Sequence, residues 1–251
     1  MGQITILGSS FALPGPQMEN TYLVVQEGAR TVLVDCVGNP VVRLQQAGID
    51  PLQITELILT HFHPDHVSGV PLLLMDLWLM GRKDQLKIYG LKDTIRRTNT
   101  MMGLYEWQHW PGFFPVEFHG FPEKESTLLF DTPEIKVTGS PVKHLVPTLG
   151  LRFEFKGSGK SAAYSCDTEP CPEVIKLAEN ADVLLHEASG ASKGHTTPQQ
   201  AGEVATKARV AKLYLIHYPP EAVQADMIKE AQSAFSGPVE IAKDLAKIVV
   251  E

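Results

Sequence analysis

One short segment, THFHPDH, limits the possible folds of this chain more than any other part of it. It places three of the nine histidines and an aspartate directly after an apolar run. His61 and His63 are two residues apart, so in an extended backbone both rings can point to the same side. Pro64 suits the first turn of a helix that would carry Asp65 and His66. The segment therefore predicts a strand-to-helix turn at which four potential metal ligands converge.

The number of ligands indicates more than one metal ion. Imidazole and carboxylate groups suit zinc, iron or manganese. Together with ligands from other parts of the chain, these four side chains offer more donors than one tetrahedral ion requires. His144, Asp167 and His217 each follow an apolar strand pattern, the position from which many folds build their functional sites. We expect all three to face the same pocket and to complete a site for two metals.

Strand and helix patterns alternate along the chain. The predicted strands are residues 3–8, 54–60, 86–90, 126–130, 135–140, 183–186, 212–217 and 246–250. Two further pairs of strands form hairpins, one at 21–36 that turns at Gly28 and one that pairs 150–155 with 161–166. The predicted helices are 40–48, 67–80, 93–104, 172–180, 198–208 and 221–235. Two sets of strands with helices between and outside them indicate an α/β (α+β) chain with stacked sheets. No composition change marks a boundary, so we expect a single domain over residues 1–251.

Composition argues against a secreted, membrane-spanning or disulfide-bonded protein. A hydrophobic fraction of 43% is that of an ordinary globular chain, and no segment resembles a signal peptide or a bilayer-spanning helix, so a cytoplasmic location is expected. The three cysteines, Cys36, Cys166 and Cys171, form no CxxC pair and are interpreted as reduced thiols. The net charge of -7 opposes non-specific attraction to nucleic acid.

With these residues in view, the whole chain resembles the metallo-β-lactamase superfamily, whose HxHxDH signature matches the histidine-rich turn. The resemblance implies a four-layer αββα sandwich with the site at one edge between the sheets. It also implies two divalent ions, expected to be zinc with manganese or iron as alternatives. The implied ligands are His61, His63 and His144 for one ion, Asp65, His66 and His217 for the other, and Asp167 as the bridge between them.

Within that superfamily the chain is most similar to the branch of tRNase Z and related phosphodiesterases and arylsulfatases. The segments VLLHEASG and GHTTPQQAGEVATKARVAKLYLIHY match the branch's His-Glu box and its His-Ser/Thr-Thr loop, although Leu245 stands where glycine is frequent. The match implies that His195, positioned by Glu187, donates a proton to the leaving oxygen, while Asp65 orients the attacking hydroxide. The alternative is that His195 only begins a helix and that Glu187 caps or pairs at the surface.

These features predict a metal-dependent hydrolase of phosphodiester or related sulfate and aryl esters. A small ester is favoured over tRNA, because the chain lacks the glycine-rich basic arm with which tRNA-processing members grip their substrate. The alternatives are a tRNA 3′-processing endonuclease, a thioester hydrolase of the glyoxalase II kind, a mononuclear-iron persulfide dioxygenase and, least favoured, a non-catalytic binding module.

Two apolar segments raise the question of assembly. The predicted helix at 70–80 is apolar around nearly its whole circumference, so it must be covered on more than one face. We therefore expect a homodimer through this helix, as in members of the tRNase Z branch. Residues 104–121 concentrate aromatic side chains, which form either core, a subunit interface or an apolar pocket wall.

Overall fold

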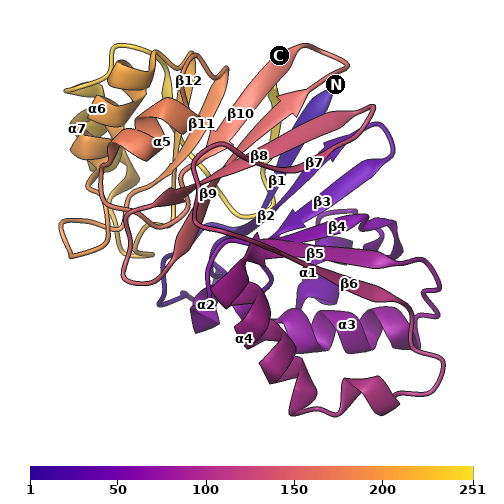
Figure 1. Ribbon diagram of the computed structural model, residues 1–251. Helices are drawn as coiled ribbons and strands as arrows, with labels where there is room; N and C mark the ends of the chain where they lie inside the picture. Colours follow the sequence, from indigo (N-terminus) through magenta and orange to yellow (C-terminus); the bar gives the residue numbers. More distant parts are fainter. Residues whose placement is uncertain (251) are drawn as a thin grey trace.

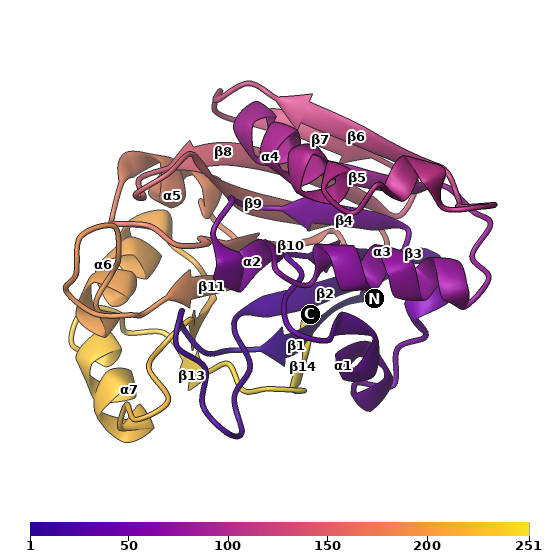
Figure 2. The ribbon, with the colours of Figure 1, turned by 90° about the horizontal axis from the view of Figure 1, so that it is seen from below.

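The computed structural model describes residues 1–250 as two seven-stranded sheets stacked face to face, with helices on both outer sides (Figures 1 and 2). This arrangement confirms the αββα four-layer sandwich. The first sheet has the order β14-β1-β2-β3-β4-β5-β6, and the second has the order β13-β12-β11-β10-β9-β8-β7. The chain fills the first sheet, crosses to the second, and returns at its end to place β14 beside β1.

The strands of the first sheet are β1 (Gly2–Gly8), β2 (Tyr22–Glu27), β3 (Arg30–Val34), β4 (Glu56–Leu59), β5 (Leu86–Leu91), β6 (Val116–Phe121) and β14 (Lys247–Val250). Those of the second are β7 (Thr127–Asp131), β8 (Ile135–Val142), β9 (Thr148–Phe155), β10 (Lys160–Tyr164), β11 (Val183–Glu187), β12 (Lys212–Ile216) and β13 (Val239–Ile241). Strands β3 to β6 run parallel to one another, and so do β10 to β13. Parallel strands end at the same edge of their sheet, which gives each sheet one edge suited to a site.

Helices cover the two outer faces (Figure 2). The helices on the first sheet are α1 (Pro40–Gln46), α2 (Pro64–Val67), α3 (Val70–Leu79) and α4 (Lys92–Gly103); those on the second are α5 (Pro172–Leu177), α6 (Pro198–Ala208) and α7 (Gln224–Gln232). Two short 3-10 helices, η1 (Pro51–Gln53) and η2 (Trp107–His109), lie in connections. Among residues 1–250, no helix is both long enough and apolar enough to cross a bilayer.

Side-chain alternation along the strands builds three apolar layers. In β3, Val32 and Val34 pack into the layer between the sheets, while Leu33 packs against the helices. In β11, Leu185 faces the inner layer and Leu184 the helices. Because both faces of these strands are buried, each has a run of three consecutive apolar residues rather than an alternation with polar ones.

The structure departs from the predicted elements at a few places. The helix predicted at 67–80 is two helices, α2 and α3, separated at Gly69. A Cβ at Gly69 would lie 2.8 Å from the backbone of Val37, so this residue must be glycine where α2 turns into α3. Strands β6 and β13 were not predicted, because β6 lies inside the aromatic segment and β13 has only three residues.

The aromatic segment forms part of the outer layer of the first sheet. Trp107, Trp110 and Phe113 pack against the apolar cluster beneath α3 and α4, and Trp110 stacks on Trp78 with ring centroids 5.3 Å apart. Tyr105 is exposed at the surface of this layer. The other aromatic side chains of the segment therefore pack half-buried on the core, only Phe114 is fully buried, and more than half of the positions in the segment are exposed.

Candidate metal centre

The seven predicted ligands come from four connections, and the structure brings them together where the two sheets meet. His61 and His63 lie on the turn after β4, and Pro64 occupies the first position of α2, as the sequence predicted. The other ligands are Asp65 and His66 on α2, His144 on the β8–β9 turn, Asp167 after β10 and His217 after β12. They form two groups of converging ligand atoms, each group within 4.8 Å: His61, His63 and His144, and then Asp65, His66, Asp167 and His217.

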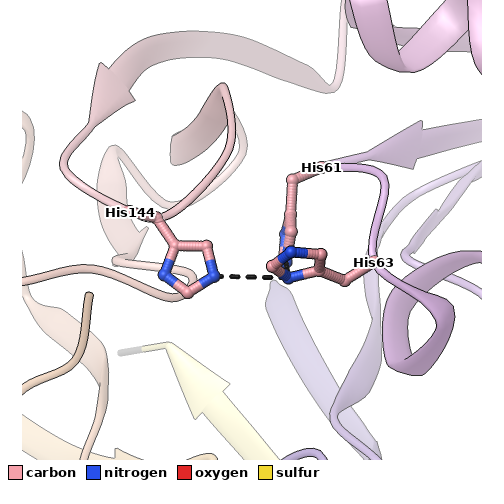
Figure 3. Close-up of side chains that lie close together, drawn as sticks. All are labelled: His61, His63 and His144. Atoms are coloured by element: carbon pink, nitrogen blue, oxygen red, sulfur yellow. Dashed lines mark hydrogen bonds between the residues drawn. The ribbon is translucent and has the colours of Figure 1, made fainter. Parts of the chain in front are cut away.

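The first group consists of three imidazoles that face one another (Figure 3). The Nδ1 atom of His63 lies 3.0 Å from Nε2 of His61 and 3.3 Å from Nε2 of His144. Three nitrogens bound at about 2.0–2.1 Å to a tetrahedral ion would lie about 3.3 Å apart. Burial lowers the pKa of His61 well below its usual value and lowers that of His63 and His144 as well. All three rings therefore favour the neutral form, which is the form that binds metals.

The second group combines two imidazoles with two carboxylates. The Oδ2 atom of Asp167 lies 3.3 Å from Nε2 of His217 and 3.5 Å from Nε2 of His66. The same oxygen lies 3.9 Å from Nε2 of His144 in the first group. Asp167 is thus placed between the groups, where a bridging ligand would have to be. Asp65 closes the second group, with Oδ2 3.6 Å from Nε2 of His66.

Unpaired polar atoms show that the second group fits a cation. Nε2 of His66, Nε2 of His217 and Oδ1 of Asp167 are buried and have no hydrogen-bond partner within residues 1–250. Leaving such atoms unpaired costs free energy, and native structures rarely do so without a reason. All three atoms belong to the converging ligands, so a divalent ion in this group would satisfy them.

Outer contacts fix the orientation of four of the five histidine rings. Each of these rings uses Nδ1 for a protein partner and leaves Nε2 for the shared centre, an arrangement usual for metal-binding histidines. The partners are Thr60 Oγ1 for His61 (3.1 Å), Asp35 Oδ2 for His66 (2.8 Å), the Gly194 carbonyl for His144 (2.8 Å) and Ser189 Oγ for His217 (2.8 Å). His63 differs, because it turns Nδ1 towards the centre.

Asp35 is the most deeply placed of these partners and was missed in the sequence. Its carboxylate is fully buried and accepts hydrogen bonds from the backbone N–H and the hydroxyl of Thr60. Burial opposes a charged His66, but Asp167 and Asp35 together raise the pKa of that ring well above its usual value. Asp35 follows strand β3, so the signal that identified His217, a polar residue directly after an apolar strand, could have identified it.

His195 lies beside both ligand groups and is held by a buried acid. Its Nδ1 is 2.9 Å from Oε1 of Glu187, and its ring centroid lies 5.0 Å from that of His144 and 5.9 Å from that of His217. The bond to Glu187 raises the pKa of His195 and favours the imidazolium. Glu187 is fully buried rather than at the surface. The start of α6 is capped by Thr197 in a capping box, two residues after His195.

Cys166 adjoins the bridging position but is not a convincing ligand. Its Sγ lies 3.6 Å from Nδ1 of His61, the ring nitrogen that also contacts Thr60, and within 4.8 Å of a ring nitrogen of His66. Burial raises the pKa of this thiol well above its usual value. Since only the thiolate binds metal well, Cys166 is best understood as a packed thiol.

Comparison with known proteins agrees with this geometry. The family model described as "Beta-lactamase superfamily domain" matches residues 30–218. The ribonuclease Z of Methanothermobacter thermautotrophicus is 27% identical over an alignment that covers all of this chain and 97% of that protein. Among solved structures, the human tRNase Z short form has a TM-score of 0.81 at 24% identity, with 99% of each chain covered. A diphosphatase from the PhnP family has a TM-score of 0.80 at 18% identity, covering 100% of this chain and 98% of that one.

Proposed function

Because the chain belongs to the metallo-β-lactamase superfamily of hydrolases, we propose that it cleaves a phosphodiester bond at the edge between its two sheets. The observation that carries the proposal is the His195–Glu187 pair beside two metal-ligand groups. A leaving alkoxide needs a proton, and an imidazolium held by a buried carboxylate is placed to donate it. A thioester hydrolase, the glyoxalase II alternative, would not require this pair.

The metal requirement follows from the ligand set. We assign one ion to His61, His63 and His144 and a second to Asp65, His66 and His217, with Asp167 shared. When bound, two divalent ions supply a water of lowered pKa and positive charge against the phosphoryl oxygens. Imidazole and carboxylate ligands in this ratio suit zinc, which we propose as the native metal.

The chain's own side chains have distinct roles in the proposed reaction. Burial raises the pKa of Asp65, but its contacts with His217 and His66 outweigh burial and lower it, so this carboxylate stays ionised. Besides binding metal, Asp65 can therefore accept a hydrogen bond from the attacking water and orient it. His195 donates a proton to the leaving oxygen, and Glu187 fixes the tautomer and ring orientation that this transfer needs.

The relatives' names favour RNA as the substrate. Ribonuclease Z and tRNase Z are among the proteins to which this chain is similar over its whole length. They support the tRNA 3′-processing alternative better than the small ester that the sequence analysis preferred. We therefore take precursor tRNA as the first candidate substrate.

A small diester remains the second candidate for a specific reason. The alignment with the Methanothermobacter protein runs over 306 positions, more than the 251 residues of this chain, so that relative has insertions that this chain lacks. The β9–β10 connection, between His144 and Asp167, is a short hairpin turn with no room for an RNA-gripping arm. The net charge of -7 also weakens capture of a polyanion.

One panel of substrates tests the proposal. The zinc-loaded protein would be assayed at physiological salt with a precursor tRNA carrying a 3′ trailer, with bis-p-nitrophenyl phosphate, and with S-lactoylglutathione. We expect cleavage of both phosphodiesters, and their relative kcat/KM ranks the two candidates. Thioester hydrolysis without diester cleavage would refute the proposal. A separate sample loaded with iron and given a persulfide tests the dioxygenase alternative, and oxygen consumption by protein that holds one iron would refute the proposal as well. Chelated protein is the control for metal dependence.

A further inference from the structure

The loop between β11 and α6, residues 188–197, connects His195 to a metal ligand through a single residue. Gly194, directly before His195, accepts a hydrogen bond on its carbonyl from Nδ1 of His144 at 2.8 Å. The N–H of the same glycine donates to Oε1 of Glu169 at 3.0 Å. Gly194 is therefore held from both sides, by a predicted metal ligand and by an acid to which the proposed chemistry gives no role.

Glu169 is itself anchored next to that ligand. It lies two residues after Asp167, and its N–H donates to the carbonyl of Lys143 at 2.8 Å. Its second carboxylate oxygen, Oε2, lies 2.5 Å from Nζ of Lys143, the residue that precedes His144. The side chain of Glu169 thus joins three connections, namely the turn after β8, the segment after β10 and the loop that carries His195.

The tip of this loop has little else to fix it. Residues 191–193 are exposed, and the backbone bonds from His195 to Ser192 and from Gly190 to Thr196 remain within the loop. Apart from the contacts of Gly194 and His195, the bonds that leave the loop start at its two ends: Ala188 N–H donates to the Ile216 carbonyl, Ser189 contacts His217, and the Thr196 hydroxyl donates to the Thr168 carbonyl. Gly194 has a φ of +85°, and a Cβ there would approach Nδ1 of His144 to 3.0 Å. The close approach of loop and ligand therefore depends on a glycine whose N–H needs an acceptor, and Glu169 is that acceptor.

We propose that Glu169 is a positioning residue that holds the 188–197 loop so that His195 stays aligned with the leaving oxygen. This rests on the proposed function, because alignment matters only if His195 protonates a leaving group. Glu169 acts through Gly194 and does not itself touch the substrate. Small displacements of a catalytic group can lower rates by roughly 10- to 10²-fold. The alternative is that Glu169 only forms a surface ion pair with Lys143, whose side chain is 66% exposed; such pairs contribute little.

Four variants separate these possibilities. Glu169→Ala removes both contacts, and Glu169→Gln keeps an acceptor for Gly194 while losing the charge. Lys143→Ala removes only the ion pair. Glu173→Ala, at an acid on α5 that is half-buried like Glu169, is the matched control. We expect Glu169→Ala to lower kcat at least about tenfold on a diester with an alkyl leaving group and to change it little on a p-nitrophenyl ester. The other three variants should stay within about threefold of wild type on both substrates.

Two further measurements test the role of the loop directly. If Glu169 acts through His195, then Glu169→Ala should cause almost no additional loss in a His195→Ala background. Hydrogen exchange of peptides covering 188–197 should be faster in Glu169→Ala and close to wild type in Glu169→Gln, and this readout needs no substrate. Unchanged exchange in Glu169→Ala overturns the proposal even if no diester is cleaved. Equal losses on both leaving groups, or full additivity with His195→Ala, overturn it as well.

Discussion

Replacing Asp35 by asparagine should weaken the second metal group without changing the first. One carboxylate oxygen accepts the backbone N–H of Thr60 at 2.8 Å, and the other lies 2.8 Å from Nδ1 of His66. An asparagine of the same shape has one acceptor and one donor, so either Thr60 N–H or His66 Nδ1–H must face another donor. Losing one charge-assisted hydrogen bond costs about 1.5–3 kcal/mol, which matches the roughly 10- to 10²-fold loss of metal affinity known for such outer contacts.

The measurement is a competition titration of the metal-free protein with zinc and a chromogenic chelator. Wild type should take up two ions, whereas Asp35→Asn should take up one with unchanged affinity and the other with affinity lowered by about 10- to 10²-fold. Asp84→Asn, at an exposed aspartate, is the control for the loss of a negative charge. Thr60→Val removes a hydroxyl that contacts both Asp35 and Nδ1 of His61, so it should weaken binding of the first ion as well. This difference separates the two outer contacts, and the variant remains informative if Asp35→Asn folds poorly. Two tightly bound ions in Asp35→Asn would refute this account of His66.

Four further outcomes are expected. Asp167→Ala should lose at least one metal ion, because two cations would repel each other without their shared anion; a fully loaded variant would contradict the bridging assignment. His195→Ala should keep both metals and lose about 10²–10⁴-fold in turnover on poor leaving groups but much less on p-nitrophenyl esters; equal losses would exclude a general acid. In a pH–rate profile, turnover on poor leaving groups should fall as pH rises through the raised pKa of His195. Glu187→Gln lacks the carboxylate that raises this pKa, so its fall should shift to lower pH. An unshifted profile would show that Glu187 does not act through His195. Light scattering at micromolar concentration should show a dimer. Because Leu72 and Leu79 on α3 are exposed, Leu79→Glu should weaken that dimer. A monomeric wild type would show that the predicted interface does not form.

The turn that carries His61, His63, Asp65 and His66 could be predicted because these residues are close together in the chain. His61, His63 and Pro64 lie within one extended segment and the first turn of a helix, where backbone geometry alone places the rings on one side. The helix starting at Pro198 was predicted with its observed bounds, and the structure closes its start with a capping box between Thr197 and Gln200. In both cases the residues that interact are neighbours in the chain.

The outer contacts could not be predicted in the same way. Asp35 and His66 are 31 residues apart, and Gly194 and His144 are 50 apart, so only the assembled sheets bring them together. The division of the predicted helix at 67–80 has a similar cause. Gly69 lies between the two helices against the backbone of Val37, which is far away in sequence and leaves no space for a side chain. A polar residue after an apolar strand can mark Asp35 as a candidate, but only tertiary packing decides that it pairs with His66.

The placement of the site explains why its chemistry is easier to predict than its substrate. Asp35, His61, Asp167, Glu187 and His217 lie at or just beyond the carboxyl ends of β3, β4, β10, β11 and β12, strands that the two sheets bury on both faces. Their positions are set by the core and leave a polar signal at the end of an apolar run. We expect substrate choice to depend instead on connections such as the β9–β10 turn, whose residues are exposed and so carry no comparable pattern. A change of substrate within this fold therefore requires different loops and leaves the metal ligands as they are.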